Sequence, residues 1–340
     1  MDKRVIFAVA GAGKTTHIVE NLSLQKRSLI ITYTESNYAN LQRKITKKFN
    51  NEWPSNITLM TYFTFLYRFC YKPFLADKVR AKGLIYEKNP NQGLKQTERR
   101  YYMTETRYLY SNRITLLFEK CNIIDEIKKR IETYFDEIII DEIQDIGGRD
   151  FDFLEQLMST NVNILFVGDF YQHTYDTSRD GNDNGSLFAN QKRYEKRFSD
   201  KGVMVNHKSL QKSWRCSANI CEYIRNNLGI EIYSQTDSTG TVEYVSDLQR
   251  INEILRDNGI VKLHFRNSAK YGLNHRNWGD TKGEDCYYDV CVLLNKSTAK
   301  NFAERTLQNL APLTKNKLYV AITRAHNNVY FIDESYATML

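Results

Sequence analysis

The sequence predicts an α/β fold in which parallel sheets carry helices on both faces. The main observation is an alternation of short β-rich runs, turn residues and helical patterns along the chain, which is typical of parallel sheets. Size and composition agree, because 340 residues that are 41% apolar and include only 4 prolines can form about two domains. The β-rich runs also fall into two groups, which predicts one sheet in each domain.

The expected strands of the first domain are five runs, Arg4–Ala8, Ser28–Thr32, Ile57–Met60, Glu137–Ile140 and Asn163–Val167. Those of the second domain are Thr241–Val245, Ile260–Phe265, Val290–Leu294 and Val329–Ile332. A charged, tyrosine-rich and helix-leaning stretch interrupts the first sheet between Tyr71 and Tyr134, and the domain boundary is expected near Gly202–Lys208. We therefore expect a first domain of residues 1–70 and 135–206, a helical insertion of residues 71–134 and a second domain of residues 207–340.

The overall composition limits the classes of function. The net charge of +8 favours a polyanionic partner, although basic residues that only solvate the surface would explain this excess equally well. The 6 cysteines form no CxxC pair and have no histidine cluster beside them, so the sequence indicates neither a zinc site nor a disulfide framework. Reduced thiols and the lack of a long apolar segment predict a cytoplasmic protein without a membrane span.

The segment after the first expected strand has the pattern of a phosphate-binding loop. Ala8–Thr15 reads AVAGAGKT, with alanine at the first glycine position of the general pattern, and a helical pattern follows. Gly11 and Gly13 allow backbone amides to face the β-phosphate, Lys14 reaches the β/γ oxygens and the Thr15 hydroxyl can ligate Mg²⁺. We therefore expect ATP and Mg²⁺ as cofactors, with a chance match as the alternative. The expected nucleotide-binding residues of the loop are Ala10, Gly11, Ala12, Gly13, Lys14, Thr15 and Thr16.

Two adjacent carboxylates end another expected strand. The apolar run Ile138–Ile140 leads into Asp141 and Glu142, and ligands bind at this edge of open α/β sheets. Asp141 can hold Mg²⁺ through water while Glu142 polarises an attacking water, the division of roles that phosphoryl transfer to water requires. On its own, a strand that ends in acids is more often a solvated turn.

Asp141–Asp145, which reads DEIQD, resembles the second motif of the UvrD/Rep group of superfamily 1 helicases. Six further segments are similar to other motifs of this family and follow in the same order, namely Thr32–Ser36, Thr61–Phe65, Val167–Tyr175, Leu210–Ser217, Lys282–Asp285 and Leu318–Ala325. The compact arrangement is also similar to helicase subunits of antiphage defence systems such as Gabija. The resemblance implies a P-loop NTPase with two RecA-like parallel-sheet domains, a small helical insertion in the first, and ATP held between the domains.

The resemblance implies catalytic roles for Lys14, Glu142, Gln172, Arg215 and Arg324. Gln172 would sense the γ-phosphate and couple it to DNA. Arg215 and Arg324 would act as arginine fingers, whose planar cations stabilise charge on the transferred phosphoryl group. Surface arginines in salt bridges are the alternative.

The adenosine part of ATP would be held by other residues. Trp214 occupies the place of an aromatic that stacks on adenine in this family, although core burial is the better guess for an isolated tryptophan. The family's ribose contact falls on Asp285, with Glu284 beside it, and the assignment is ambiguous by one residue.

Aromatic residues in three of the motifs are expected to bind single-stranded DNA. Tyr33, Phe63 and Tyr175 lie in motifs that line the strand-binding groove of the family, together with Thr61. An aromatic face stacks on any base, which suits movement without sequence preference. Core packing is an equally good explanation for each ring taken singly. Thr177 replaces the family's second aromatic after the third motif, which weakens the expected stacking.

The resemblance implies an ATP-dependent DNA translocase or helicase that moves 3′ to 5′ on single-stranded DNA, with a nuclease or another DNA-processing subunit as partner in antiphage defence. The alternative is a switch in which ATP and DNA binding control a partner nuclease without processive unwinding. The complete catalytic set favours hydrolysis. Only a short stretch that includes Ser268–Arg276 separates Phe265–Asn267 from the fifth motif, where full helicases insert an accessory domain. We therefore expect hydrolysis with poor unaided unwinding.

Overall fold

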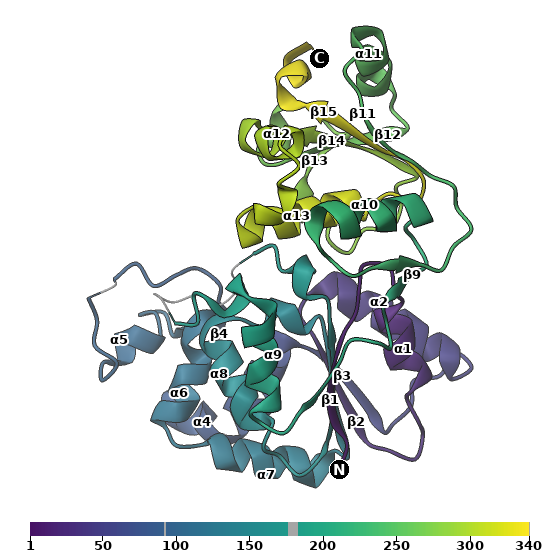
Figure 1. Ribbon diagram of the computed structural model, residues 1–340. Helices are drawn as coiled ribbons and strands as arrows, with labels where there is room; N and C mark the ends of the chain where they lie inside the picture. Colours follow the sequence, from purple (N-terminus) through teal and green to yellow (C-terminus); the bar gives the residue numbers. More distant parts are fainter. Residues whose placement is uncertain (92, 176–182, 340) are drawn as a thin grey trace. The chain divides into compact units, whose positions relative to one another are not determined.

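The computed structural model describes residues 1–91, 93–175 and 183–339, and two large parallel sheets with surrounding helices dominate it (Figure 1). The described residues form two compact units. The first comprises those in Met1–Ile6, Thr15–Gly168 and Asp176–Asn206, and the second comprises those in Phe7–Lys14, Asp169–Tyr175 and His207–Leu340. The predicted α/β class with parallel sheets is confirmed.

The first sheet has the strand order β3-β2-β6-β7-β1-β8. Its strands are β1 (Lys3–Phe7), β2 (Ser28–Thr32), β3 (Ile57–Thr61), β6 (Glu137–Asp141), β7 (Asn163–Gly168) and β8 (Met204–Asn206). Ile30 of β2 lies opposite Ile139 of β6, and both are buried, as expected for strands covered on both faces. The five predicted strands are present, whereas β8 was not predicted.

Helices cover both faces of this sheet. They include α1 (Lys14–Glu20), α2 (Glu35–Lys48), α8 (Gly148–Leu157) and α9 (Gln191–Ser199). In Figure 1, α1 and α2 lie on one side of the sheet, and α8 and α9 lie on the other. The Thr34 hydroxyl begins α2 by accepting a hydrogen bond from the N–H of Asn37 at 3.2 Å. Leu41 and Ile45 of α2 are fully buried, which fixes its inward face.

The insertion begins as the continuation of one helical run. This run comprises α3 (Tyr62–Thr64), a π-helix (Phe65–Tyr71) and α4 (Lys72–Val79), so the predicted border at residue 70 falls inside it. The rest consists of β4 (Gly83–Ile85), α5 (Arg99–Tyr102), β5 (Tyr108–Tyr110), α6 (Ile114–Lys120) and α7 (Ile124–Tyr134). Strands β4 and β5 pair in parallel, which the helical pattern of this region did not predict.

The second sheet has the order β11-β15-β14-β12-β13, and its pairings are all parallel. Its strands are β11 (Val242–Tyr244), β12 (Ile260–His264), β13 (His275–Asn277), β14 (Asp289–Leu294) and β15 (Val329–Asp333). The four predicted strands are present, and β13 is additional. A short parallel pair is formed by β9 (Lys212–Ser213) and β10 (Tyr233–Ser234).

The helices of the second unit are α10 (Ala218–Leu228), α11 (Leu248–Arg256), α12 (Lys296–Ala303) and α13 (Pro312–Ile322). Helix α10 begins after Ser217, whose hydroxyl accepts from the N–H of Ile220 at 3.3 Å, and it contacts α13. Among the described residues, no helix is long and apolar enough to cross a bilayer.

A buried histidine pair joins β12 and β13. His264 Nε2 lies 2.8 Å from His275 Nδ1, and the ring of Tyr271 stacks on His264 with centroids 4.4 Å apart. His264 is fully buried, and burial followed by the neighbouring His275 lowers its pKa to about 4. In the folded chain His264 is therefore neutral down to mildly acidic pH.

This pair predicts that the protein loses stability in mild acid. The unfolded chain binds a proton at His264 below its ordinary pKa of ~6.5, whereas the folded chain does not. The contribution of His264 is therefore complete above pH ~6.5 and is lost as the pH falls toward ~4, at about 1.4 kcal/mol per pH unit for one proton. Urea unfolding of the wild type and His264→Gln, compared at pH ~7.5 and pH ~5, measures it. Identical pH dependence of the two proteins would contradict the assignment.

Candidate functional site

The loop between β1 and α1 has a backbone suited to phosphate binding. Gly11 and Gly13 have φ angles of 71° and 82°, in the left-handed region that glycine adopts without strain. A Cβ at Gly11 would lie 2.6 Å from Ser213 Oγ and 2.8 Å from Arg215 Cβ, which leaves no room for a side chain. The N–H of Trp214 donates to the Gly11 carbonyl at 2.9 Å. The loop and the segment Ser213–Arg215 therefore pack together within the second unit.

The other predicted residues of the loop lie in different surroundings. Ala10 and Ala12 are buried, whereas Lys14 and Thr15 are half-buried in the first turn of α1. Thr16 is exposed, and its hydroxyl accepts a hydrogen bond from a lysine of α2 at 3.0 Å. Lys14 and Thr15 thus keep partly accessible side chains for a nucleotide.

The two predicted acids lie at the C-terminal end of the central strand β6. Asp141 ends the strand and is 2% exposed, and its Oδ1 accepts the N–H of Glu142 at 3.0 Å. Glu142 has φ 57° and ψ 48°, a left-handed conformation that costs a residue with a side chain about 1–2 kcal/mol. Such strain persists where the surrounding structure enforces it, and it is frequent at functional sites.

Gln144 contacts this strained residue, although it is not among the residues for which the sequence predicts a role. Its Nε2 donates to a carboxylate oxygen of Glu142. Gln144 is fully buried, and a Cβ on Gly168 at the end of β7 would lie 2.3 Å from its Oε1. The side chain of Gln144 is therefore locked against the neighbouring strand and orients the Glu142 carboxylate.

A Mg²⁺ ion fits this donor set only together with a nucleotide. No group of three or more His, Cys, Asp and Glu side chains in residues 1–91, 93–175 and 183–339 could hold a metal ion. Mg²⁺ typically keeps several waters and binds through one or two carboxylates plus phosphate oxygens. The Thr15 hydroxyl and the Asp141 carboxylate are residues of the required kind, and their assignment stays a prediction.

The segment after β7 is organised by Asp169. Its carboxylate is 1% exposed, accepts the N–H of Tyr171 at 3.1 Å and accepts the hydroxyl of Tyr319 at 3.1 Å. Gln172 is 4% exposed, and its N–H donates to the Asp169 carbonyl at 2.9 Å. The predicted phosphate sensor thus sits in a turn that a buried carboxylate fixes.

Both predicted arginine fingers lie in the second unit, in different surroundings. The Arg215 side chain is 11% exposed, forms an ion pair with Asp285 and donates from Nη1 to the Thr323 carbonyl at 3.1 Å. Arg324 is 1% exposed, and its Nη1 donates to the carbonyls of Thr281 at 3.1 Å and Glu284 at 2.8 Å. A surface salt bridge therefore does not describe Arg324.

The two guanidinium groups influence each other. Burial, and next the charge of Arg215, lower the pKa of Arg324 to about 10, so Arg324 remains a cation near neutral pH. Burial acts to raise the pKa of Asp285, but Arg215 and then His326 lower it overall. A buried guanidinium group that feels the charge of a half-buried one, with one carboxylate beside them, is an environment that favours a further anion.

The residues predicted for adenosine are also in the second unit. Trp214 is 66% exposed, so its ring is available for stacking and is not part of the core. Asp285 binds Arg215 and His326, whereas the Glu284 carboxylate accepts the hydroxyl of Tyr287. Both acids remain candidates for the ribose contact.

An aromatic cluster lies at the ends of β2 and β3. Tyr33 lies 5.6 Å from Phe63 and 6.0 Å from Tyr62, measured between ring centroids. The ring of Tyr86, from the insertion, contacts Phe63 edge-on at 5.0 Å and is 68% exposed. Thr61 is buried, and its hydroxyl donates to Thr64 at 2.9 Å. Tyr62 is buried and belongs to the core. Tyr86 is an exposed member of the cluster that no motif in the sequence predicts.

Tyr175, the third predicted DNA contact, is 48% exposed. Its hydroxyl donates to Asp280, and Lys317 Nζ lies 5.9 Å from its ring centroid. A held ring next to a cation is suitable for stacking beside a phosphate. Thr177 lies outside the described residues.

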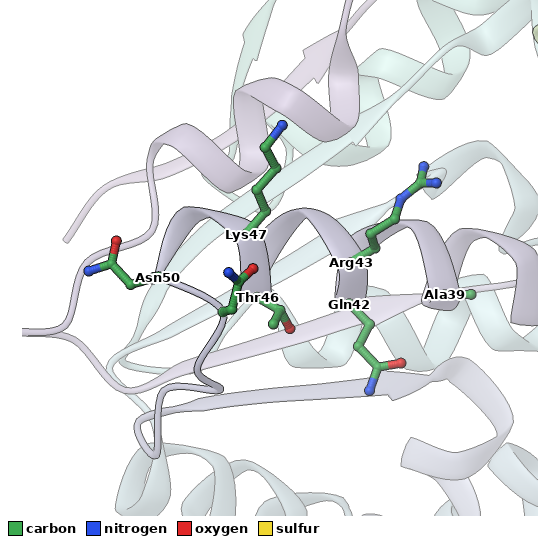
Figure 2. A pocket seen from close by; sticks show the side chains of 7 residues that line it. Ala39, Gln42, Arg43, Thr46, Lys47 and Asn50 are labelled. Atoms are coloured by element: carbon green, nitrogen blue, oxygen red, sulfur yellow. The ribbon is translucent and has the colours of Figure 1, made fainter.

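One surface pocket has no relation to these residues. It measures about 650 Å³ and lies along α2 and the turn after it, lined by Ala39, Gln42, Arg43, Thr46, Lys47, Asn50 and Asn51 (Figure 2). None of the predicted site residues lines it, so we do not assign the site there.

The glycine loop after β1, the acids at the end of β6 and the two parallel sheets define a P-loop protein with two RecA-like domains. Residues 2–178 match the family described as AAA domain, and the chain belongs to this family. No curated protein was found to match the sequence.

The fold is similar to that of an Arterivirus helicase, nonstructural protein 10, whose structure was solved as a complex with DNA. The TM-score is 0.53 at 14% sequence identity, and the likeness covers 97% of this chain and 61% of the helicase chain. At this identity the likeness shows the fold alone. Membership of the UvrD/Rep group, the similarity to Gabija helicase subunits and movement in the 3′-to-5′ direction therefore remain predictions.

Proposed function

We propose that the chain is an ATP-dependent nucleic-acid motor that hydrolyses ATP and moves along single-stranded DNA. The observation that carries this proposal is Glu142, a carboxylate kept in a strained backbone conformation at the end of a central strand and oriented by buried Gln144. Backbone strain of this kind clusters at active sites, where it is part of the mechanism. The similar Arterivirus protein is a helicase solved with DNA, which agrees with the proposal.

In this proposal the side chains divide the work. Lys14 contacts the β- and γ-phosphates, and Glu142 accepts a proton from the attacking water. Bound Mg²⁺ supplies charge neutralisation at the phosphate oxygens. Arg215 and Arg324 stabilise the charge that develops on the transferred phosphoryl group. Gln172 senses the γ-phosphate.

The finer assignment is a motor of the UvrD/Rep type that moves 3′ to 5′ and acts with a nuclease or another DNA-processing subunit in antiphage defence. The order of the seven motifs supports it. The second candidate is a switch that binds ATP and DNA and controls a partner nuclease. The ion pair between Arg215 and Asp285 favours this second candidate, because part of the guanidinium is already engaged by a carboxylate of the same unit.

ATP hydrolysis measured with and without single-stranded DNA tests the proposal. We expect turnover that DNA stimulates and that Lys14→Ala abolishes. Absence of turnover in the wild type, with ATP and DNA binding intact, would favour the switch. A strand-displacement assay on a duplex with a 3′ single-stranded tail tests the finer assignment. We expect little strand displacement without a partner, because separating each base-pair step costs about 1.4 kcal/mol of stacking free energy.

Removing an exposed ring should weaken DNA binding. We expect Tyr86→Ala and Tyr175→Ala each to weaken binding of single-stranded DNA by about 1–3 kcal/mol, the usual contribution of one stacked base. Fluorescence anisotropy with a labelled oligonucleotide measures the change. Tyr134→Ala is the matched control, because Tyr134 is 52% exposed on the insertion and lies outside the aromatic cluster. Unchanged affinity in both variants would remove these rings from the DNA site.

A further inference from the structure

The hydroxyl of Tyr319 joins two segments of the proposed nucleotide site. Tyr319 lies in α13 and is fully buried. Its oxygen accepts the N–H of Ala10, in the glycine loop, at 2.9 Å. The same hydroxyl donates to Asp169 Oδ2 at 3.1 Å. All three residues belong to the second unit.

The direction of both hydrogen bonds is fixed by chemistry. An amide N–H can only donate and a carboxylate can only accept, so the hydroxyl must accept from Ala10 and donate to Asp169. Burial, and next Asp169, raise the pKa of Tyr319 well above its ordinary value, so the phenol keeps its proton. Ala10 and Asp169 are 0% and 1% exposed, and water cannot easily replace the hydroxyl.

Backbone carbonyls in and just after the same helix also accept hydrogen bonds from both arginines. Four residues after Tyr319, the carbonyl of Thr323 accepts Arg215 Nη1 at 3.1 Å. The Nε of Arg324 donates at 3.2 Å to the carbonyl of Val320, which lies in the last turn of α13. Any shift of α13 therefore moves the anchors of both guanidinium groups together with Tyr319.

We propose that Tyr319 is a positioning residue for ATP hydrolysis, which ties the glycine loop at Ala10 and the turn at Asp169 to the helix that anchors Arg215 and Arg324. This inference rests on the proposed function. The hydroxyl holds the loop, the Gln172 turn and the arginine anchors in one arrangement, so that phosphate bound in the loop meets the sensor and the cations together. Tyr319 itself touches no nucleotide in this scheme.

Tyr319→Phe tests the role, because it removes only the hydroxyl and keeps the ring that packs edge-on against Tyr171 at 5.9 Å. We expect kcat to fall by about 10- to 100-fold, the scale of one lost hydrogen bond to a charged group, while KM and the Kd for Mg-ADP change less than about threefold. Tyr223→Phe is the control, because within the described residues the buried Tyr223 hydroxyl has no hydrogen-bond partner. This control should keep wild-type kcat.

A double-mutant cycle separates positioning from loss of packing. If Tyr319 acts through the arginines, Tyr319→Phe should reduce kcat less in an Arg324→Lys background than in the wild type. Unchanged kcat in Tyr319→Phe, equal losses in affinity and kcat, or fully multiplicative losses in the cycle would overturn the inference. Each of these outcomes leaves the motor proposal standing if the wild type hydrolyses ATP. A wild type without turnover defeats the proposed function first and this inference with it.

Discussion

Glu142→Gln is expected to lower kcat for ATP hydrolysis by about 10²- to 10⁴-fold, the contribution of a positioned general base. Glutamine keeps the size of the side chain and its contact with Gln144 but cannot accept the proton of the attacking water. ATP binding should therefore persist, and the bound nucleotide should remain unhydrolysed. Lys14→Ala should also abolish turnover but weaken nucleotide binding, since it removes a phosphate contact.

Single-turnover hydrolysis and equilibrium binding of a fluorescent ATP analogue measure these two effects separately. Glu126→Gln is the matched control, because Glu126 is exposed on α7, remote in sequence from every predicted motif residue. A kcat within tenfold of the wild type in Glu142→Gln would mean that another group activates the water. Equal loss of binding in both variants would instead indicate a structural role for the carboxylate.

Arg215→Ala is expected to reduce kcat by on the order of 10³-fold with nucleotide affinity largely retained, as for other arginine fingers. Arg324 requires a milder change, because its guanidinium donates to two carbonyls in a buried position and alanine would leave them without this donor. Arg324→Lys keeps the charge and loses the planar donor geometry, so we expect a comparable decrease in kcat.

Arg276→Ala provides the control, because Arg276 is exposed in the same unit and donates to the nearby backbone carbonyls of Leu273 and His275. Thermal unfolding of each variant establishes that the fold persists. If Arg215→Ala turned over ATP at the wild-type rate, Arg215 would have only a structural role, through its ion pair with Asp285 and its hydrogen bond to the Thr323 carbonyl.

The central strands could be predicted from the sequence because they are buried on both faces. Their centres, Leu29–Ile31 and Ile138–Ile140, are continuous apolar runs, as expected for strands of a covered parallel sheet. The strands β8 and β13 have three residues each and read MVN and HRN, so no β-rich run marks them, whereas the equally short β11 lies inside the β-rich run Thr241–Val245. The conformation of the phosphate-binding loop could also be predicted from the sequence, because glycine adopts positive φ angles such as those at Gly11 and Gly13 without strain.

Residues that act through distant contacts could not be predicted. Gln144 orients Glu142 only because Gly168 of the neighbouring strand leaves room for it. Tyr319 meets Ala10 across 309 positions of sequence, and Tyr86 meets Phe63 only after the insertion folds back. Among 23 tyrosines, nothing local marks these two, since their partners are set by tertiary structure.

The backbone at Glu142 also bears on how this chain can evolve. Glycine enters a left-handed position without strain, whereas valine or isoleucine is nearly excluded there. Activity and thermodynamic stability therefore favour different residues at this one position. Under the proposed function, a descendant of this chain that no longer needed hydrolysis could accept glycine at position 142, so selection for hydrolysis must maintain the carboxylate there.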